Sequence, residues 1–219
     1  MFSIFKNFFG SSRNLRHISS NFKSLKKTSN VVKIFECIEN YSSKAEIRYV
    51  GGCVRKILKK EIVDDIDLAT NLRPDQVISV LKKNNIPFYE TGIKFGTITA
   101  YINDEKYEIT SLRKDISTDG RYATVEFTDE WQKDAERRDF TINTIYSDLD
   151  GNLFDPFNGV EHLKEGKIVF VGETDKRIKE DYLRILRYLR FFSKYSKIKH
   201  DQNIIKNINK NLFGISKIS

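Results

Sequence analysis

The feature that most constrains this chain is the run Asp65-Ile66-Asp67, which closely follows the dipeptide Gly51-Gly52. Side chains two apart on a β-strand point to the same side of it, so these two carboxylates would repel each other in water. A divalent cation between them removes the repulsion, and Mg²⁺ is usually held by one or two carboxylates together with substrate phosphates. The sequence therefore predicts a strand that carries a metal site beside a phosphate-binding turn.

Strand and helix patterns alternate around this run and predict a mixed α+β domain. We expect strands at residues 46–50, 65–70, 95–103 and 106–112, and helices at 53–60 and 74–84. The polar stretch 113–129 is predicted to be a loop, and residues 130–147 a helix broken near Asp139. The longest helix is predicted at 174–195. Its expected buried stripe is Ile178, Tyr182, Ile185, Leu186, Leu189 and Phe192.

Charge is unevenly distributed along the chain. The 219 residues carry a net charge of +8, yet residues 1–35 contain seven Lys/Arg and no acid. Residues 176–219 carry a net +9, which leaves the middle of the chain at −8. Basic surface attracts polyanions, nucleic acid above all, although an ordinary solvated surface is the alternative. The motifs below favour nucleic acid.

Cysteine content and hydropathy bear on disulfides, membrane association and cellular location. Two cysteines give no disulfide framework, and no apolar run approaches the roughly 20 residues of a membrane span, so no membrane partner is expected. Residues 1–30 form a basic, Ser-rich arm without acids, which resembles a mitochondrial targeting segment. We favour a basic arm on a cytoplasmic protein and keep a mitochondrial location as the alternative.

Glu108 is the candidate for a third acid. In the predicted strand Tyr107 and Ile109 share one face, while Glu108 and Thr110 share the other. If this strand lies beside the strand of Asp65 and Asp67, three carboxylates meet at one edge and could hold two metal ions. The alternative is a surface acid on an edge strand.

Two basic segments are candidates for binding phosphate. Gly51-Gly52 offers backbone amides and a helix start to phosphate oxygens, and Arg55 adds a fork of donors. In the block 137–143, Arg138 is a candidate for the triphosphate and Asn143 for a ribose hydroxyl. A charge cluster on a helix surface is the alternative for the second segment.

The run 180–187 contains Asp181 and Arg184, which would be neighbours on a helix. An ordinary ion pair is one interpretation. The other is that the pair imitates a nucleobase edge, because Asp accepts from an amino group and Arg donates to a ring nitrogen. That pattern suits cytosine and adenine and rejects uracil and guanine. Arg187 and Arg190 continue the ridge and could hold phosphate or the other side of the base.

Together these residues resemble the class II tRNA nucleotidyltransferase family, which comprises the CCA-adding enzymes and bacterial poly(A) polymerases. The resemblance runs from about residue 47 to 195, and the stretch 118–138 is most similar to alphaproteobacterial members. It rests on five blocks in order: Gly51-Gly52-x-x-Arg55, Asp65-x-Asp67, Glu108-Ile109-Thr110, Arg137-Arg138-Asp139-Phe140-Thr141-Ile142-Asn143, and Glu180-Asp181-x-x-Arg184.

The resemblance implies a polymerase-β-like head, a mixed sheet flanked by helices, at residues 31–158, after the basic arm 1–30. A short all-α neck that binds nucleotide and RNA would occupy residues 159–219. Family members usually continue into helical body and tail domains beyond this point. Three alternatives stay open: the sequence is a fragment, a second chain supplies the body, or the protein works without one. Lys56 departs from the family, which usually has Asp or Asn there.

The resemblance also implies roles. Asp65 and Asp67 match the metal-binding pair and Glu108 the third catalytic carboxylate, with two Mg²⁺ ions expected. Nucleotide-contacting positions would be Gly51, Gly52, Arg55, Arg138, Asn143, Asp181, Arg184, Arg187 and Arg190. The implied reaction adds C, A or both to the tRNA 3′ end from CTP and ATP. A poly(A) polymerase or A-only adder is the alternative, and a non-catalytic RNA-binding remnant is a further one.

Overall fold

A computed structural model describes residues 22–218 except 24, 28, 120 and 121, so most of the predicted arm 1–30 lies outside the described residues. A seven-stranded mixed sheet has the order β3-β4-β5-β2-β1-β8-β9. Its strands are β1 (Ile47–Val50), β2 (Ile66–Thr70), β3 (Phe88–Gly92), β4 (Thr97–Ile102), β5 (Glu105–Ser111), β8 (Tyr146–Ser147) and β9 (Leu153–Phe154). The predicted fold class, a mixed sheet flanked by helices, is confirmed.

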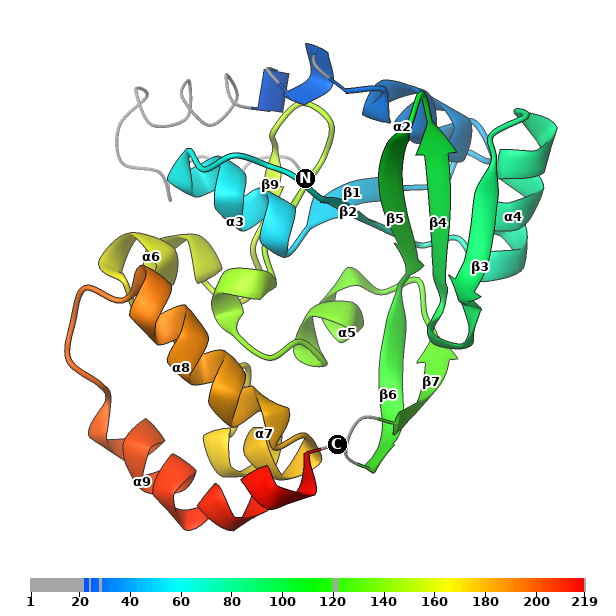
Figure 1. Cartoon of the computed structure of the whole chain (residues 1–219). Coiled ribbons are helices and arrows are strands. Elements are labelled where there is room, and N and C mark those ends of the chain that lie inside the picture. The colour runs from blue at the N-terminus through cyan, green and yellow to red at the C-terminus, as the bar shows by residue number, and fades with distance from the viewer. Residues whose placement is uncertain (1–21, 24, 28, 120–121, 219) are drawn as a thin grey trace, which may run out of the picture.

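Two helices cover one face of this sheet (Figure 1). They are α2 (Val31–Glu39) and α4 (Pro74–Lys83). Proline at the first position of α4 has no backbone N–H to leave unpaired. Both helices bury one apolar stripe against inward-facing strand residues such as Leu68, Tyr107 and Ile109. The polar side chains that alternate with these residues therefore face the other side of the sheet.

The centre of the sheet positions the acids. Strand β2 pairs parallel with β5 and antiparallel with β1, and the parallel register sets Asp67 opposite Glu108. The helix α3 (Gly52–Lys59) connects β1 to β2. Because Tyr107 and Ile109 are fully buried, Glu108 is directed away from the core, as the alternation predicted.

The predicted polar loop at 113–129 is wrong. The segment forms β6 (Arg113–Asp119) and β7 (Tyr122–Phe127), an antiparallel ribbon that continues below β5 (Figure 1). Opposite charges face each other across it, with Lys114 Nζ 3.1 Å from Glu126 Oε1. A ribbon of two strands with polar side chains leaves little hydrophobic alternation in the sequence, which is why the pattern indicated a loop.

The predicted helix at 130–147 is largely wrong as well. Only α5 (Trp131–Glu136) is helical, followed by the short 3₁₀ turn η3 (Thr141–Asn143) and by β8, which extends the sheet. The break near Asp139 is confirmed. Phe140 has an extended backbone and bridges to Phe170, so tertiary pairing overrides the local helical pattern.

The predicted helix 174–195 consists of two helices. They are α7 (Thr174–Glu180) and α8 (Leu183–Tyr195), separated by Asp181, whose backbone is extended and whose carboxylate accepts from Leu183 N at 2.9 Å. The break rotates α8, so Leu186 and Leu189 are 42% and 45% exposed instead of buried. Tyr188 and Phe191 take their place in the core.

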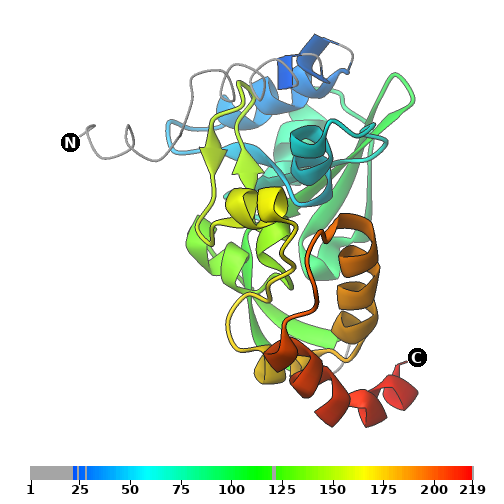
Figure 2. The same cartoon turned by 90° about the vertical axis from the view of Figure 1, so that its left-hand side faces the viewer.

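The C-terminal helices form the second core. It joins α6 (Gly159–Glu165), α7, α8 and α9 (Gln202–Lys210), and the 3₁₀ turn η4 (Leu212–Lys217) follows. In Figure 2 the red end of the chain, with α9, lies at the end opposite α2. Phe140 and Ile142 also belong to this core, so packing does not separate the chain at 158/159, and that boundary stays a prediction. Within the described residues, no helix has the length and apolar character to cross a membrane.

Candidate active site

Three carboxylates approach one another where β2 lies beside β5, and we call Asp65, Asp67 and Glu108 the acidic edge. Asp67 and Glu108 are direct partners in the parallel register, and Asp65 immediately precedes β2. Burial raises the pKa of Asp67, and the negative charges of Glu108 and Asp65 raise it further. Asp67 is thus close enough to Asp65 and Glu108 to interact with both electrostatically.

The acidic edge is open and only partly neutralised. Lys106 Nζ lies 2.6 Å from Glu108 Oε1, and both side chains are close to half exposed. Among the described residues no three His, Cys, Asp or Glu side chains already surround a common point. Carboxylate oxygens, from exposed Asp65 and partly exposed Asp67 and Glu108, suit a hard cation such as Mg²⁺, which takes few protein ligands and completes its shell with water and phosphate oxygens.

The turn before α3 lies directly against the acidic edge. Gly51 has φ +65°, a conformation that favours glycine, and Gly52 begins the helix. A Cβ atom on Gly52 would lie 3.5 Å from Asp67 Oδ2, and one on Gly51 would lie 3.4 Å from Arg138 Nη1. The turn therefore lies between a carboxylate of the acidic edge, Asp67, and the guanidinium group of Arg138.

Arg138 is held by a buried acid. Asp134 is 1% exposed and accepts from Arg137 Nε at 2.8 Å, Arg138 Nη2 at 2.9 Å and Tyr146 Oη at 2.6 Å. Burial alone would raise the pKa of Asp134, but the charges of Arg138 and Arg137 and the Tyr146 hydrogen bond hold it far below its ordinary value. The pairing fixes the Arg138 side chain beside the turn.

A second chain of polar contacts joins α3 to α8. Arg55 donates to Asn143 Oδ1, Asn143 Nδ2 donates to Asp139 Oδ1 at 2.8 Å, and Arg187 Nε donates to Asp139 Oδ2 at 2.6 Å. The Arg55 guanidinium also lies 4.8 Å from the centre of the Phe191 ring. Both ends of the Asn143 amide are engaged inside the protein, so its suggested contact with ribose stays a prediction.

Asp181 and Arg184 do not form the ion pair that their spacing suggested. Arg184 is buried, and its Nη1 donates to Glu180 Oε2 and to the Arg177 carbonyl, each at 2.8 Å. Asp181 caps the start of α8 instead. At the helix break the Asp181 carboxylate accepts from Leu183 N, while the Arg184 guanidinium donates to Glu180 and to the Arg177 carbonyl, so each side chain has a partner other than the expected one.

Several residues that hold the site together were not predicted to do so. Arg177 Nη2 donates to the carbonyls of Arg137 and Arg138 at 2.5 and 2.6 Å, which ties α7 to the site. Asp134, Asp139 and Tyr146 hold arginines in place. The sequence did contain a sign of this role. The pair Arg137-Arg138 would carry uncompensated positive charge if it were buried alone, and the acids close to it in sequence, Asp134 and Asp139, are the obvious partners.

The structure therefore brings most of the predicted residues into one region. We call Gly51, Gly52, Arg55, Arg138 and Asn143 the nucleotide side. It lies against Asp67 on the β1 side of the acidic edge. Arg187 is joined to it through Asp139, and Arg190 lies outside, exposed, with its guanidinium 5.0 Å from the Phe191 ring centre.

Comparisons with known proteins agree with this geometry. Residues 47–169 match the family described as the Poly A polymerase head domain. The mitochondrial CCA tRNA nucleotidyltransferase 1 of Homo sapiens is 48% identical over 177 residues, 80% of this chain and 41% of that protein. A CCA-adding enzyme of Lactobacillus johnsonii is 39% identical over 150 residues, 68% of this chain and 37% of that protein. The chain thus spans about two fifths of the length of these relatives.

Solved structures give the same result. The CCA-adding enzyme of Bacillus stearothermophilus in complex with CTP has a TM-score of 0.70 and 27% identity, covering 95% of this chain and 46% of that one. A tRNA nucleotidyltransferase complexed with a primer tRNA and an incoming ATP analogue has a TM-score of 0.63 and 25% identity, covering 81% of this chain and 50% of that one. With the five sequence blocks and the head fold, these matches show that the chain belongs to the class II CCA-adding nucleotidyltransferase family.

Proposed function

We propose that the protein is a nucleotidyltransferase that adds C, A or both to the 3′ end of tRNA, using CTP and ATP. The observation that carries the proposal is the placement of Asp67 between a partner acid, Glu108, and the turn at Gly52. Repelling carboxylates beside a glycine turn serve no structural purpose, because the cluster is strained without a cation. The relatives named CCA tRNA nucleotidyltransferase support the choice of substrate.

Magnesium is the proposed cofactor, with two ions expected. Asp65 and Asp67 would hold it, with Glu108 as the third carboxylate, and its remaining ligands would come from water and phosphate. When bound, the metal neutralises the triphosphate and polarises the phosphoryl group. The all-oxygen donor set and the raised pKa of Asp67, caused by burial and by Glu108, fit a site for a hard cation.

The residues of the chain would act mainly by positioning. The backbone at Gly51-Gly52 and the start of α3 would receive the triphosphate, with Arg138 directed there by Asp134. The primer 3′-oxygen would bond to the α-phosphorus while the bond to the pyrophosphate oxygen breaks. The hydroxyl proton would pass to Glu108 and then to water. Pyrophosphate would leave on the nucleotide side.

Base selection is proposed for Asp181 and Arg184, with Arg187 and Arg190 beside them. In the structure Arg184 is held by Glu180, so Glu180 would orient the guanidinium that faces the base. Replacing Arg184 with Ala is expected to relax the preference for CTP over UTP. Because Arg184 is buried, Arg184→Lys serves as the folded control that keeps the charge but loses the fork.

Transfer itself is tested with an RNA hairpin that lacks its 3′-terminal CCA, labelled CTP or ATP, and Mg²⁺. We expect incorporation by the unmodified chain and a loss of at least about 10³-fold in Asp67→Asn, because charge stabilisation of the transferred group disappears. Asp64→Asn is the matched control, since Asp64 is exposed beside the site and pairs with Lys56. Absence of incorporation, with or without a helical partner chain, would refute the proposal.

The same assay separates the alternatives. Incorporation of A alone, or of long A tails, would identify an A-only adder or a poly(A) polymerase. A chain that binds RNA but shows no Mg²⁺-dependent stabilisation by CTP in a thermal shift would be a non-catalytic remnant. A second chain that supplies a helical body would appear as a partner that raises incorporation on full tRNA but not on a short hairpin.

Location is proposed from the sequence arm and the relatives. We favour the cytoplasm, and the relative named as mitochondrial in Homo sapiens keeps the organelle as the alternative. Residues 1–30 fused to a fluorescent reporter would decide between them. Import of the reporter into mitochondria would overturn the cytoplasmic proposal.

A further inference from the structure

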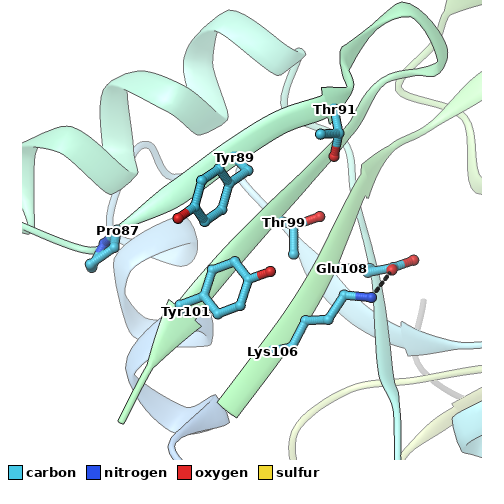
Figure 3. A pocket seen from close by; sticks show the side chains of 7 residues that line it. All are labelled: Pro87, Tyr89, Thr91, Thr99, Tyr101, Lys106 and Glu108. Carbon is cyan, nitrogen blue, oxygen red and sulfur yellow. Dashed lines mark ion pairs between the residues drawn. The ribbon is translucent and has the colours of Figure 1, made fainter. Parts of the chain in front are cut away.

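An open hollow of about 570 Å³ adjoins the acidic edge on the outer face of β3, β4 and β5 (Figure 3). We call it the tyrosine hollow. It is lined by Pro87, Tyr89, Thr91, Thr99, Tyr101, Lys106 and Glu108. The lining residues come from three adjacent strands and the approach to β3, and the strand register explains why they share a face. Tyr89 is paired with Thr99, Thr99 with Glu108, and Tyr101 with Lys106.

The hollow has an aromatic floor that the described residues leave uncovered. Tyr89 is 62% exposed, and its ring meets that of Tyr101 edge to face, with centroids 5.3 Å apart. Exposed aromatic rings on a sheet face, beside a cation, are the typical platform for unstacked bases. Lys106 supplies the cation, and the hydroxyls of Thr91 and Thr99 can donate to phosphate or sugar oxygens.

The order of the strands indicates from which side of the acidic edge the attacking RNA end approaches. The nucleotide side lies on the β1 side of the acidic edge, whereas the tyrosine hollow lies on the β5-β4-β3 side. In phosphoryl transfer the attacking and leaving oxygens lie roughly in line through the phosphorus. If the triphosphate and its leaving group occupy one side of Asp67 and Glu108, the attacking hydroxyl must arrive from the other.

We propose that the tyrosine hollow is the primer subsite, in which Tyr89 and Tyr101 stack the last unpaired bases of the RNA 3′ end. This inference rests on the proposed function. Glu108 belongs to both places, so a chain end stacked in the hollow has its terminal hydroxyl beside the acidic edge. Aromatic rings stack with any base, so the hollow can hold the primer whether its last nucleotide is C or A. Selection of the incoming base is left to Asp181 and Arg184.

The first test measures steady-state kinetics with an RNA hairpin that has a single-stranded 3′ end. We expect Tyr89→Ala and Tyr101→Ala each to raise KM for the RNA about tenfold, since stacking losses of that size are usual. KM for CTP should change less than twofold. Tyr89→Trp, which keeps a stacking ring, should retain most of the affinity. Tyr41→Ala is the matched control, because Tyr41 is 43% exposed on a different surface.

The second test uses binding alone, so it does not depend on turnover. Fluorescence anisotropy of a short labelled RNA ending in CC is measured without nucleotide, and folding of each variant is verified by its unfolding midpoint. Weaker binding by both alanine variants supports the subsite even if no incorporation is seen, in which case only the proposed function fails. Unchanged RNA binding and unchanged KM for RNA in both folded variants would overturn the subsite and point to a protein partner on this face.

Discussion

The two sides of Asp67 are built differently. On the nucleotide side Arg55 is held by the Asn143 amide and Arg138 by Asp134, and Arg187 is joined to that side through Asp139. Both acids, Asp134 and Asp139, are buried. At the acidic edge the three carboxylates are at least partly exposed and like charges face one another, and in the tyrosine hollow every lining residue except Thr99 is at least partly exposed. The nucleotide side is therefore a scaffold held by internal partners, whereas the acidic edge and the tyrosine hollow keep charges and rings available for a ligand.

This difference has a thermodynamic consequence. Removing a partner from a buried ion network leaves a charge without compensation and destabilises the fold. Removing a repelling carboxylate relieves strain and should cost function alone. Substitutions on the two sides should therefore change stability in opposite directions, and the predictions below test that contrast in order of decreasing effect.

The largest effect is expected for Asp134→Asn, which keeps the shape of the side chain and removes its charge. Arg137 and Arg138 then lack a counter-ion, and we expect a loss of about 3 kcal/mol in the free energy of unfolding. Thermal denaturation should show an unfolding midpoint about 6–12 °C lower. The exposed Asp129→Asn is the control and should change stability by less than about 0.5 kcal/mol.

The pH dependence of Asp134 follows from the direction of its shift. The pKa of Asp134 lies below its unfolded value, because burial, which raises it, is outweighed by Arg138, Arg137 and Tyr146. Its stabilisation is therefore fully present above the unfolded pKa of about 3.9 and is lost as the pH falls toward the folded value. The gap between the original chain and Asp134→Asn should narrow below about pH 4. A constant gap would contradict this account.

The second prediction concerns Arg187→Met, which removes the partner of buried Asp139. Burial would raise the pKa of Asp139, but the Arg187 charge and hydrogen bonds from Asn143 and Arg187 hold it below its ordinary value. We expect a loss of about 2 kcal/mol in unfolding free energy, the usual size for a hydrogen bond to a charged group. KM for CTP should rise severalfold because Asp139, which accepts from Asn143, loses its own partner and holds Asn143 less firmly.

Arg190→Met is the control for this variant. Arg190 lies over the same Phe191 ring as Arg187 but is exposed, so its loss should change the unfolding free energy by less than about 0.5 kcal/mol. Equal destabilisation by both substitutions would mean that contact with Phe191, and not the Asp139 pair, holds α8 to the site. In that case the description of the nucleotide side as an ion-paired scaffold would fail.

The acidic edge could be predicted from the sequence better than the nucleotide side. Alternation in 107–110 put Glu108 on the face opposite the buried Tyr107 and Ile109, and the strand register sets Asp67 beside it. Asp65 lies just before β2, and its negative charge acts on Asp67. These inferences hold because a strand has a period of two and its buried face is apolar. A local pattern is sufficient to fix which face such a residue takes.

The scaffold could not be predicted in the same way, because its contacts join distant segments. Arg187 meets Asp139 across 48 positions, and Arg55 meets Asn143 across 88. The break at Asp181 rotated α8, exposed Leu186 and Leu189, and separated Asp181 from Arg184. Local helical spacing gave no sign of that break, since one side-chain cap and the packing of Phe140 with Tyr188 and Phe191 outweigh helix propensity there.

The third prediction reverses the sign of the first. Asp67→Asn removes a carboxylate that lies directly opposite Glu108, and like charges in that position destabilise a sheet by roughly 0.2–1 kcal/mol. We expect the unfolding midpoint of the metal-free protein to rise by about 1–3 °C while transfer is lost. Asp64→Asn should not stabilise, because Asp64 has a favourable partner in Lys56. A lower midpoint for Asp67→Asn would show that the acidic edge is not strained.

The smallest effect is expected for Lys106→Met, which removes the ammonium from Glu108. Lys106 and a divalent cation compete for the same carboxylate, and an exposed ion pair contributes at most about 1 kcal/mol. The Mg²⁺ concentration that gives half-maximal stabilisation by CTP should therefore fall about two- to fivefold in a thermal-shift titration. Lys114→Met, which breaks the exposed pair with Glu126 on the ribbon, is the control and should leave the Mg²⁺ requirement unchanged.

A higher Mg²⁺ requirement in Lys106→Met would mean that the ammonium contacts the triphosphate itself. A lower one supports a lysine that leaves Glu108 when metal binds and becomes available to the RNA backbone in the tyrosine hollow.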